Sequence, residues 1–159
     1  MKRGLCAALV AAFLFPAAAA AHTSAGWQVS LQWPAQGTVT SPFGRDGYRW
    51  HPGLDIGILQ SLDVRAAADG VVSLSGYMPG YDGYGAIVAV RHRDGYSTLY
   101  AHLSQPLVRP GQRVQAGQRI GIAGCSGWCT GTHLHFELRY RGLPVDPTLL
   151  ITESPIRVG

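Results

Sequence analysis

Short runs in which apolar and polar residues alternate recur along most of the chain, and Gly, Pro and Asp separate them. Alternation with a period of two is typical of β-strands, and those three residue types are typical of the turns between strands. The pattern predicts strands over residues 37–41, 63–67, 70–75, 85–92, 96–103, 119–123 and 132–140. No stretch keeps a helical period for more than a turn or two. We therefore predict an all-β protein with little helix, folded as a compact antiparallel β-barrel or sandwich.

Local patterns refine this prediction at the turns. Asp94-Gly95 lies between two strand-like runs and predicts a tight β-hairpin. Residues 110–114 (PGQRV) are echoed by residues 116–120 (AGQRI), which predicts two successive steps from a turn into a strand at the barrel edge. By contrast, the proline, glycines and aspartate of residues 42–50 predict an irregular loop.

The first residues carry the pattern of a secretory signal peptide. Lys2 and Arg3 precede an apolar run over residues 5–15 and small residues over 17–21. The run is short for a membrane span, so cleavage is favoured over an uncleaved anchor. We expect a signal peptide over residues 1–21, an N-terminal arm over 22–36, one domain over 37–150 and a C-terminal tail over 151–159. Such a protein would be periplasmic or secreted, without stable membrane insertion.

The charge of the chain excludes one class of partner. The 159 residues have a formal net charge of +4, from thirteen basic and nine acidic residues. Loss of Lys2 and Arg3 with the signal peptide leaves eleven basic residues and lowers the net charge to +2. The remaining arginines are scattered, without a basic block that contains aromatic residues. Nucleic acid is therefore not an expected partner.

Two cysteines remain when Cys6 leaves with the signal peptide. Cys125 and Cys129 are separated by three residues, and in an exported protein such a pair predicts a disulfide that closes a short loop. The alternative is half of a thiolate metal site, which usually needs a second pair of cysteines.

Candidate chemistry begins with two histidines at alternate positions of a predicted strand. Residues two apart on a strand point to the same face about 6.6 Å apart, so His133 and His135 can share one small site. This spacing does not say which of them would bind a metal, and a His-x-His strand can also be purely structural. Glu137 shares the face, and we give it no role beyond support of a metal ligand.

A second candidate group is formed by His51 and Asp55, which Pro52 and Gly53 separate. On a straight strand the two side chains would lie about 13 Å apart, too far to bind one ion. Pro52 and Gly53 readily accommodate a bend, so the pair can meet. The alternative is an ordinary Pro-Gly turn with polar neighbours.

The remaining histidines differ in their predicted surroundings. His102 is expected at a strand end just before a loop at Gln105-Pro106, a position typical of functional side chains. His92 is expected to be exposed beside the hairpin turn.

Together these residues form a candidate catalytic metal site. The set comprises His51, Asp55 and His135, with His102 and His133 unassigned beside it. Catalytic zinc takes three nitrogen or oxygen ligands and keeps a fourth position for water. Covalent catalysis has little support, because no Gly-x-Ser-x-Gly motif occurs and the mature cysteines are expected to pair.

Three motifs occur along the chain in this order: residues 41–45 leading to 51–55, residues 100–104, and residues 131–137. In these motifs and their order the chain resembles the lysostaphin-like or LytM-like zinc peptidoglycan endopeptidases, from about Gly37 to Pro147. The resemblance implies a compact antiparallel β domain with a duplicated hybrid motif. It implies that His51, Asp55 and His135 bind one Zn²⁺ per chain. His102 and His133 would flank the metal-bound water as general base and transition-state stabilisers, and which one is the base stays open.

The resemblance also implies a function and a substrate class. It predicts an exported monomeric enzyme that hydrolyses peptide bonds in the stem or cross-bridge of bacterial peptidoglycan. A D,D-endopeptidase is the first expectation and cleavage of a glycine-rich bridge the second. Loops at residues 45–50, 77–84 and 125–130 would border an open groove, where the glycines and tyrosines of residues 76–85 and Trp128 would contact the peptide. A mobile surface turn is the alternative for residues 76–85.

Two other functions stay open. The first is a non-catalytic module that binds peptidoglycan or activates a partner wall hydrolase, although such relatives usually lack some site residues and this chain lacks none. The second is a barrel-sandwich carrier or phosphotransfer domain, which the signal peptide and the pairing of Asp55 with His135 disfavour. The segment from Cys125 to Cys129, the cysteine loop, differs in sequence from that of many relatives. The substrate preference implied by the resemblance is therefore less secure than the implied chemistry.

Overall fold

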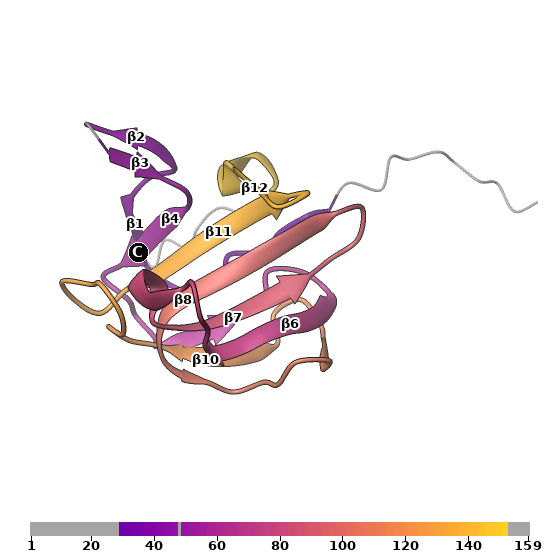
Figure 1. The fold of residues 1–159 in the computed structure, drawn as a ribbon. Helices are drawn as coiled ribbons and strands as arrows, with labels where there is room; N and C mark the ends of the chain where they lie inside the picture. The colour runs from indigo at the N-terminus through magenta and orange to yellow at the C-terminus, as the bar shows by residue number, and fades with distance from the viewer. Residues whose placement is uncertain (1–28, 48, 153–159) are drawn as a thin grey trace, which may run out of the picture.

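A computed structural model describes residues 29–47 and 49–152 as twelve β-strands and two 3₁₀ turns (Figure 1). The predicted signal peptide, residues 22–28 of the predicted arm and most of the predicted C-terminal tail lie outside the described residues. The strands are β1 Thr38–Ser41, β2 Gly44–Asp46, β3 Arg49–His51, β4 Leu54–Gly57, β5 Asp63–Arg65, β6 Gly70–Tyr77, β7 Ala86–Arg91, β8 Tyr96–Pro106, β9 Arg113–Val114, β10 Arg119–Ala123, β11 Leu134–Tyr140 and β12 Leu143–Val145. The 3₁₀ turns are η1 Asp82–Tyr84 and η2 Pro147–Leu149.

The main sheet has the strand order β1-β4-β11-β8-β7-β6-β9, and all its neighbours are antiparallel. β10 pairs with both β5 and β8, and β12 pairs with β11. Within residues 29–47 and 49–152 there is no α-helix, and hence no helix that could cross a membrane. The all-β antiparallel prediction is confirmed.

Apolar side chains cover both faces of the sheet, which is why β7 is buried along almost its whole length. On one face, Val88 and Val90 join the main core with Tyr100 and Phe136. On the other face, Ile87 and its neighbours form a smaller cluster that the tyrosines of residues 81–84 cover in part. The candidate site lies beside this second cluster on the same face of the sheet, because His135 pairs directly with Ala101 of the cluster.

The two echoed turns, at residues 110–114 and 116–120, form as the sequence predicts, and a glutamine side chain closes each of them. Gln112 Oε1 accepts a hydrogen bond from Arg109 N at 3.2 Å, and Gln118 Oε1 accepts one from Gln115 N at 3.1 Å. Each turn contains a glycine with positive φ, 84° at Gly111 and 78° at Gly117. Conformations of this kind cost least at glycine, so both repeats need it.

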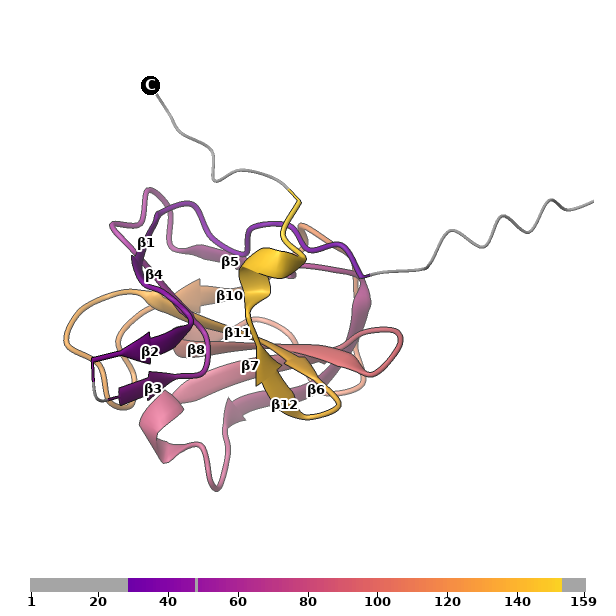
Figure 2. The same cartoon turned by 90° about the horizontal axis from the view of Figure 1, so that it is seen from above.

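Residues 42–50 correct the sequence prediction. They form the short β2–β3 hairpin instead of an irregular loop, with Gly44 paired to His51 and Arg45 to Trp50. The ring of Phe43 lies edge-on to that of Trp50, with centroids 5.3 Å apart. In both views this hairpin, the η1 segment and the loop before β11 surround the same end of the sheet (Figures 1 and 2).

Candidate metal centre

The centre is built on one cross-strand pair, Asp55 on β4 and His135 on β11. Directly opposite residues of an antiparallel pair project to the same face, so the carboxylate and the imidazole meet. His135 Nδ1 lies 2.8 Å from Asp55 Oδ1. β4 can approach β11 this closely because residue 53 is glycine, since a Cβ there would collide with the carbonyl of Phe136.

His51 completes a cluster of three potential metal-ligand atoms. It ends β3, and the chain turns at Pro52 and Gly53 before β4 begins. Its Nε2 lies 3.2 Å from Asp55 Oδ1 and 3.1 Å from His135 Nδ1. In a tetrahedral zinc site the ligand atoms lie about 3.3–3.6 Å from one another, because each is about 2.0–2.2 Å from the ion. The cluster therefore has nearly the dimensions of one face of that tetrahedron.

The outer nitrogens of both imidazoles fix their tautomers. His51 Nδ1 donates to the carbonyl of Pro42 at 2.8 Å, and His135 Nε2 donates to the Glu137 carboxylate at 3.1 Å. The inner nitrogens then carry lone pairs that face Asp55, so three acceptors converge. Such an arrangement repels itself unless a cation or extra protons lie between the acceptors. Two imidazoles, a carboxylate and outer hydrogen bonds that orient them fit zinc.

The pKa shifts of Asp55, His51 and His135 also indicate that positive charge is favoured at the cluster. Burial opposes ionisation of Asp55, but hydrogen bonds with His135 and His51 hold its pKa well below the usual range. The hydrogen bond with Asp55 raises the pKa of His51. Burial lowers the pKa of His135, yet its bonds with Asp55 and Glu137 give a net increase. Protons or a metal ion can therefore satisfy the three acceptors.

His102 enters the site through a β-bulge, not from a strand end as the sequence predicted. β8 continues to Pro106, but Tyr100 pairs with Val88 and Leu103 with Ala86, so β8 holds one extra residue there. His102 has a φ of 58°, a left-handed conformation uncommon outside glycine. In a regular strand its side chain would point away from the face that carries His135. The bulge turns the two rings to within 5.9 Å, centroid to centroid.

His102 and His133 lie together beside the three donors, with ring centroids 4.7 Å apart. The Nδ1 atoms donate to backbone carbonyls, His102 to Ser126 and His133 to Gly131, each at 2.8 Å. This leaves the lone pair of each ring on its Nε2 atom. The Nε2 atom of His133 lies 3.8 Å from Asp55 Oδ1. Burial lowers the pKa of His102, which favours its neutral, proton-accepting form.

The cysteine loop holds the Ser126 carbonyl in place. The structure joins Cys125 to Cys129 by a disulfide, with Cα atoms 5.5 Å apart. Ser126 Oγ donates to Leu103 O at 2.7 Å and accepts from Ala86 N at 3.0 Å. The loop thus fixes the carbonyl that orients His102.

The glycines of residues 76–85 do not all serve the role that the sequence indicated. A Cβ on Gly85 would collide with Ser126, and one on Gly83 would lie 3.3 Å from the Trp128 ring. These two glycines therefore admit the cysteine loop, and close approach of a ligand is not needed to explain them. A Cβ on Gly80 would meet no atom within 4 Å, and one on Gly76 would meet Met78 Cε at 3.9 Å, an ordinary contact.

The aromatic residues around the site fall into two groups. Tyr77 and Trp128 are 73% and 83% exposed and can contact a ligand. Tyr84 instead turns inward and donates to Glu137 Oε1 at 2.7 Å, and Tyr81 accepts from Arg139 at 3.3 Å. Sequence reasoning missed these inward contacts, because more than fifty residues separate the partners.

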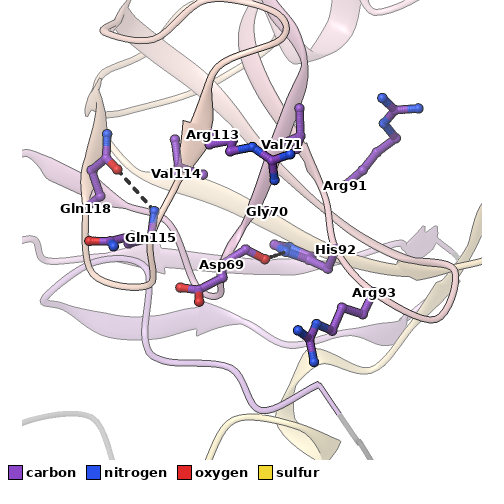
Figure 3. A pocket seen from close by; sticks show the side chains of 10 residues that line it. All are labelled: Asp69, Gly70, Val71, Arg91, His92, Arg93, Arg113, Val114, Gln115 and Gln118. Atoms are coloured by element: carbon purple, nitrogen blue, oxygen red, sulfur yellow. Dashed lines mark hydrogen bonds between the residues drawn. The ribbon is translucent and has the colours of Figure 1, made fainter.

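His92 corrects another prediction, since it is half-buried rather than exposed. Its Nδ1 donates to Asp69 O and its Nε2 lies near Thr98 Oγ1, each at 2.8 Å. It borders a hollow of about 660 Å³ lined also by Arg91, Arg93 and Arg113 (Figure 3). None of the five predicted site residues lines this hollow. The hollow is therefore separate from the candidate metal site.

Comparison with known proteins gives a family-level match. Residues 49–147 match the model of a family described as Peptidase family M23. The catalytic domain of the antimicrobial peptidase lysostaphin from Staphylococcus simulans has a TM-score of 0.68 and 27% identity, over 79% of this chain and 100% of that domain.

Two curated relatives have different printed activities. The chain is 41% identical over 126 residues to DD-carboxypeptidase/endopeptidase Mpg of Neisseria meningitidis, covering 74% of this chain and 28% of the relative. It is 39% identical over 116 residues to murein hydrolase activator NlpD of Escherichia coli, covering 73% of this chain and 30% of the relative. The match therefore spans less than a third of either relative.

Proposed function

Because the chain belongs to peptidase family M23, we propose that it is an exported zinc endopeptidase that hydrolyses peptide bonds of bacterial peptidoglycan. The observation that carries the proposal is the convergence of three acceptor atoms, from His51, Asp55 and His135, beside two further imidazoles. A purely structural metal site would gain nothing from those two imidazoles.

The residues present can supply each part of a hydrolysis. Zinc, when bound by His51, Asp55 and His135, lowers the pKa of a water ligand and polarises a peptide carbonyl. His102, neutral because of burial and oriented by Ser126, can accept the proton of the attacking water at Nε2. His133, held by Gly131, presents its Nε2 to the same space, where the neutral ring can take the base role and the protonated ring can donate to the developing oxyanion.

The substrate class follows from the family and from the exposed aromatic residues. A relative 41% identical over 126 residues is described as a DD-carboxypeptidase/endopeptidase, which supports cleavage of cross-linked stem peptides as the first choice. Resemblance to lysostaphin keeps a glycine-rich bridge as the second. Tyr77 and Trp128 are exposed and offer apolar faces to a ligand. The signal-peptide pattern supports a periplasmic or secreted location, and we propose a monomer.

The second candidate function is activation of a partner wall hydrolase. A relative 39% identical over 116 residues is described as a murein hydrolase activator, which is the specific observation in its favour. The presence of all five site residues favours the enzyme instead.

The two functions separate in one experiment on purified walls. The enzyme alone should release fragments with new amino termini, detected by mass spectrometry, and a His133→Ala variant should not. An activator would release nothing by itself and would accelerate a partner hydrolase, with or without His133.

A further inference from the structure

Glu137 is a fully buried carboxylate with no direct place in the reaction. It lies on β11 two residues after His135 and is 0% exposed. Three donors reach its two oxygens. Oε1 accepts from Tyr84 OH at 2.7 Å and from His135 Nε2 at 3.1 Å, while Oε2 accepts from Arg139 Nε at 2.6 Å.

Burying a carboxylate is costly unless its oxygens are fully hydrogen-bonded and its charge is balanced. Arg139 supplies the balancing charge, and the three donors satisfy the oxygens. Arg139 Nε donates to one carboxylate oxygen at 2.6 Å and Tyr84 OH to the other at 2.7 Å, so an ionised carboxylate is the form that satisfies both donors. A negative charge is therefore maintained behind the ring of His135.

An ionised carboxylate can only accept hydrogen bonds, so His135 must place its hydrogen on Nε2. The lone pair is then on Nδ1, the atom that lies 3.1 Å from His51 Nε2 and 2.8 Å from Asp55 Oδ1. We infer that Glu137 is the positioning residue of the metal centre, which selects Nδ1 of His135 as the ligand atom. This inference rests on the proposed metal site.

The same carboxylate connects the centre to the η1 segment. Tyr84 belongs to η1, and its ring lies edge-on to that of His135 with centroids 5.4 Å apart. Arg139 donates to Tyr81 OH at 3.3 Å and lies over the Tyr81 ring at 5.9 Å. The segment that carries both tyrosines is thus fastened to Glu137 and Arg139. Loss of the carboxylate should loosen this segment as well as the ring of His135.

Glu137→Gln is the sharpest test, because it keeps the shape and replaces an acceptor by a donor. If the amide nitrogen faces His135 and Tyr84, the stable tautomer of His135 places its hydrogen on Nδ1, toward the metal. If it faces Arg139 instead, that pair is lost. Loss of an outer-shell partner weakens metal binding by about 10–100-fold. We expect a zinc dissociation constant raised by that factor, measured by competition with a chromophoric chelator.

Asp63→Asn is the matched control, since Asp63 is also a carboxylate paired with arginine, with Arg65 at 2.9 Å and Arg119 at 2.7 Å, but away from the centre. Its zinc affinity should equal that of the unmodified protein. Equal affinity in Glu137→Gln would overturn the inference.

A second readout uses the unmodified protein and needs no variant to fold. Long-range ¹H–¹⁵N spectra of the zinc-free protein should show the hydrogen of neutral His135 on Nε2, and hydrogen on Nδ1 would refute the positioning role. Neither readout depends on wall digestion. If zinc binds and the tautomer is correct but walls are not cut, the proposed function fails while the role of Glu137 stands.

Discussion

Two histidines of the domain, the half-buried His92 and the buried His135, have hydrogen-bond partners of opposite kinds. Both nitrogens of His92 find neutral partners, the carbonyl of Asp69 and the hydroxyl of Thr98. Both nitrogens of His135 face carboxylates, those of Asp55 and Glu137. Burial lowers the pKa of His92, whereas the carboxylates raise that of His135 against burial.

The difference teaches what distinguishes a candidate metal site from a structural histidine. At His92 the hydrogen bonds run on through Thr98 to the buried Tyr100 hydroxyl, 3.0 Å away, which in turn accepts from Ala67 N. Such a chain is complete without an ion. At His135 the acceptors outnumber the donors, so the site is complete only with a cation or added protons.

The largest effect is expected at Asp55, the carboxylate that both His51 and His135 contact. Asp55→Ala removes one of the three proposed ligands and the negative charge that would attract the ion, so zinc and activity should both be lost. His51→Ala and His135→Ala should behave alike. Elemental analysis and wall digestion measure this, with Asp63→Ala as the control. Zinc retained at one per chain in all three variants would erase the distinction between His135 and His92.

The next effect separates ligands from proton-handling residues. His102→Ala and His133→Ala should keep most of the zinc, because neither side chain belongs to the three convergent donors. Hydrolysis should fall by about 10²–10⁴-fold, the usual contribution of a positioned acid or base. If His133→Ala loses the metal while His135→Ala keeps it, the ligand assignment within the pair is reversed.

A smaller effect is expected at the cysteine loop. His92 and His102 each donate Nδ1–H to a carbonyl, but only the partner of His102, Ser126, lies between paired cysteines. Replacing Cys125 and Cys129 by Ser should cost up to about 2 kcal/mol of unfolding free energy, since the closed loop is short. Hydrolysis should fall several-fold with zinc unchanged. Two freely alkylatable thiols in denatured protein from its native compartment would refute the disulfide.

The smallest functional effect is expected at His92. His92→Phe should leave zinc and hydrolysis unchanged, and lower the unfolding free energy by about 1–3 kcal/mol, because Asp69 O and Thr98 lose a partner. The folded pKa of His92 lies below the ordinary 6.5, so the unfolded chain binds a proton more readily. Its contribution is therefore present above about pH 6.5 and declines as the pH falls toward the folded pKa. Urea unfolding across this range should show that His92→Phe removes this part of the decline; a decline identical in both proteins would contradict it.

Local patterns predicted much of the fold because strands and turns report on neighbouring residues. The alternation around His133 and His135, the bend at Pro52 and the two glutamine-closed turns are all of this kind. The residues alone did not distinguish His133 from His135, because that choice depends on which one pairs with Asp55 across β4 and β11. Pairing register is a property of the assembled sheet.

The inward turn of His102 was not predictable for a different reason. Its direction depends on one extra residue in β8 relative to β7, and nothing in residues 100–104 announces a bulge. The contact of Tyr84 with Glu137 joins residues 53 apart in sequence, and no local rule relates them. The β2–β3 hairpin was missed because Gly44 and Gly47 indicate turns, which also allow a short hairpin.

The central claim is that the cation demanded by the convergent acceptors drives peptide cleavage. The most direct measurement follows purified walls digested by the same protein preparation as purified, after chelation, and after zinc is restored. We predict about one zinc per chain, loss of activity on chelation, recovery with zinc, and products with new amino termini by mass spectrometry. Full activity in protein shown by elemental analysis to be metal-free, or products with only new sugar reducing ends, would contradict the account.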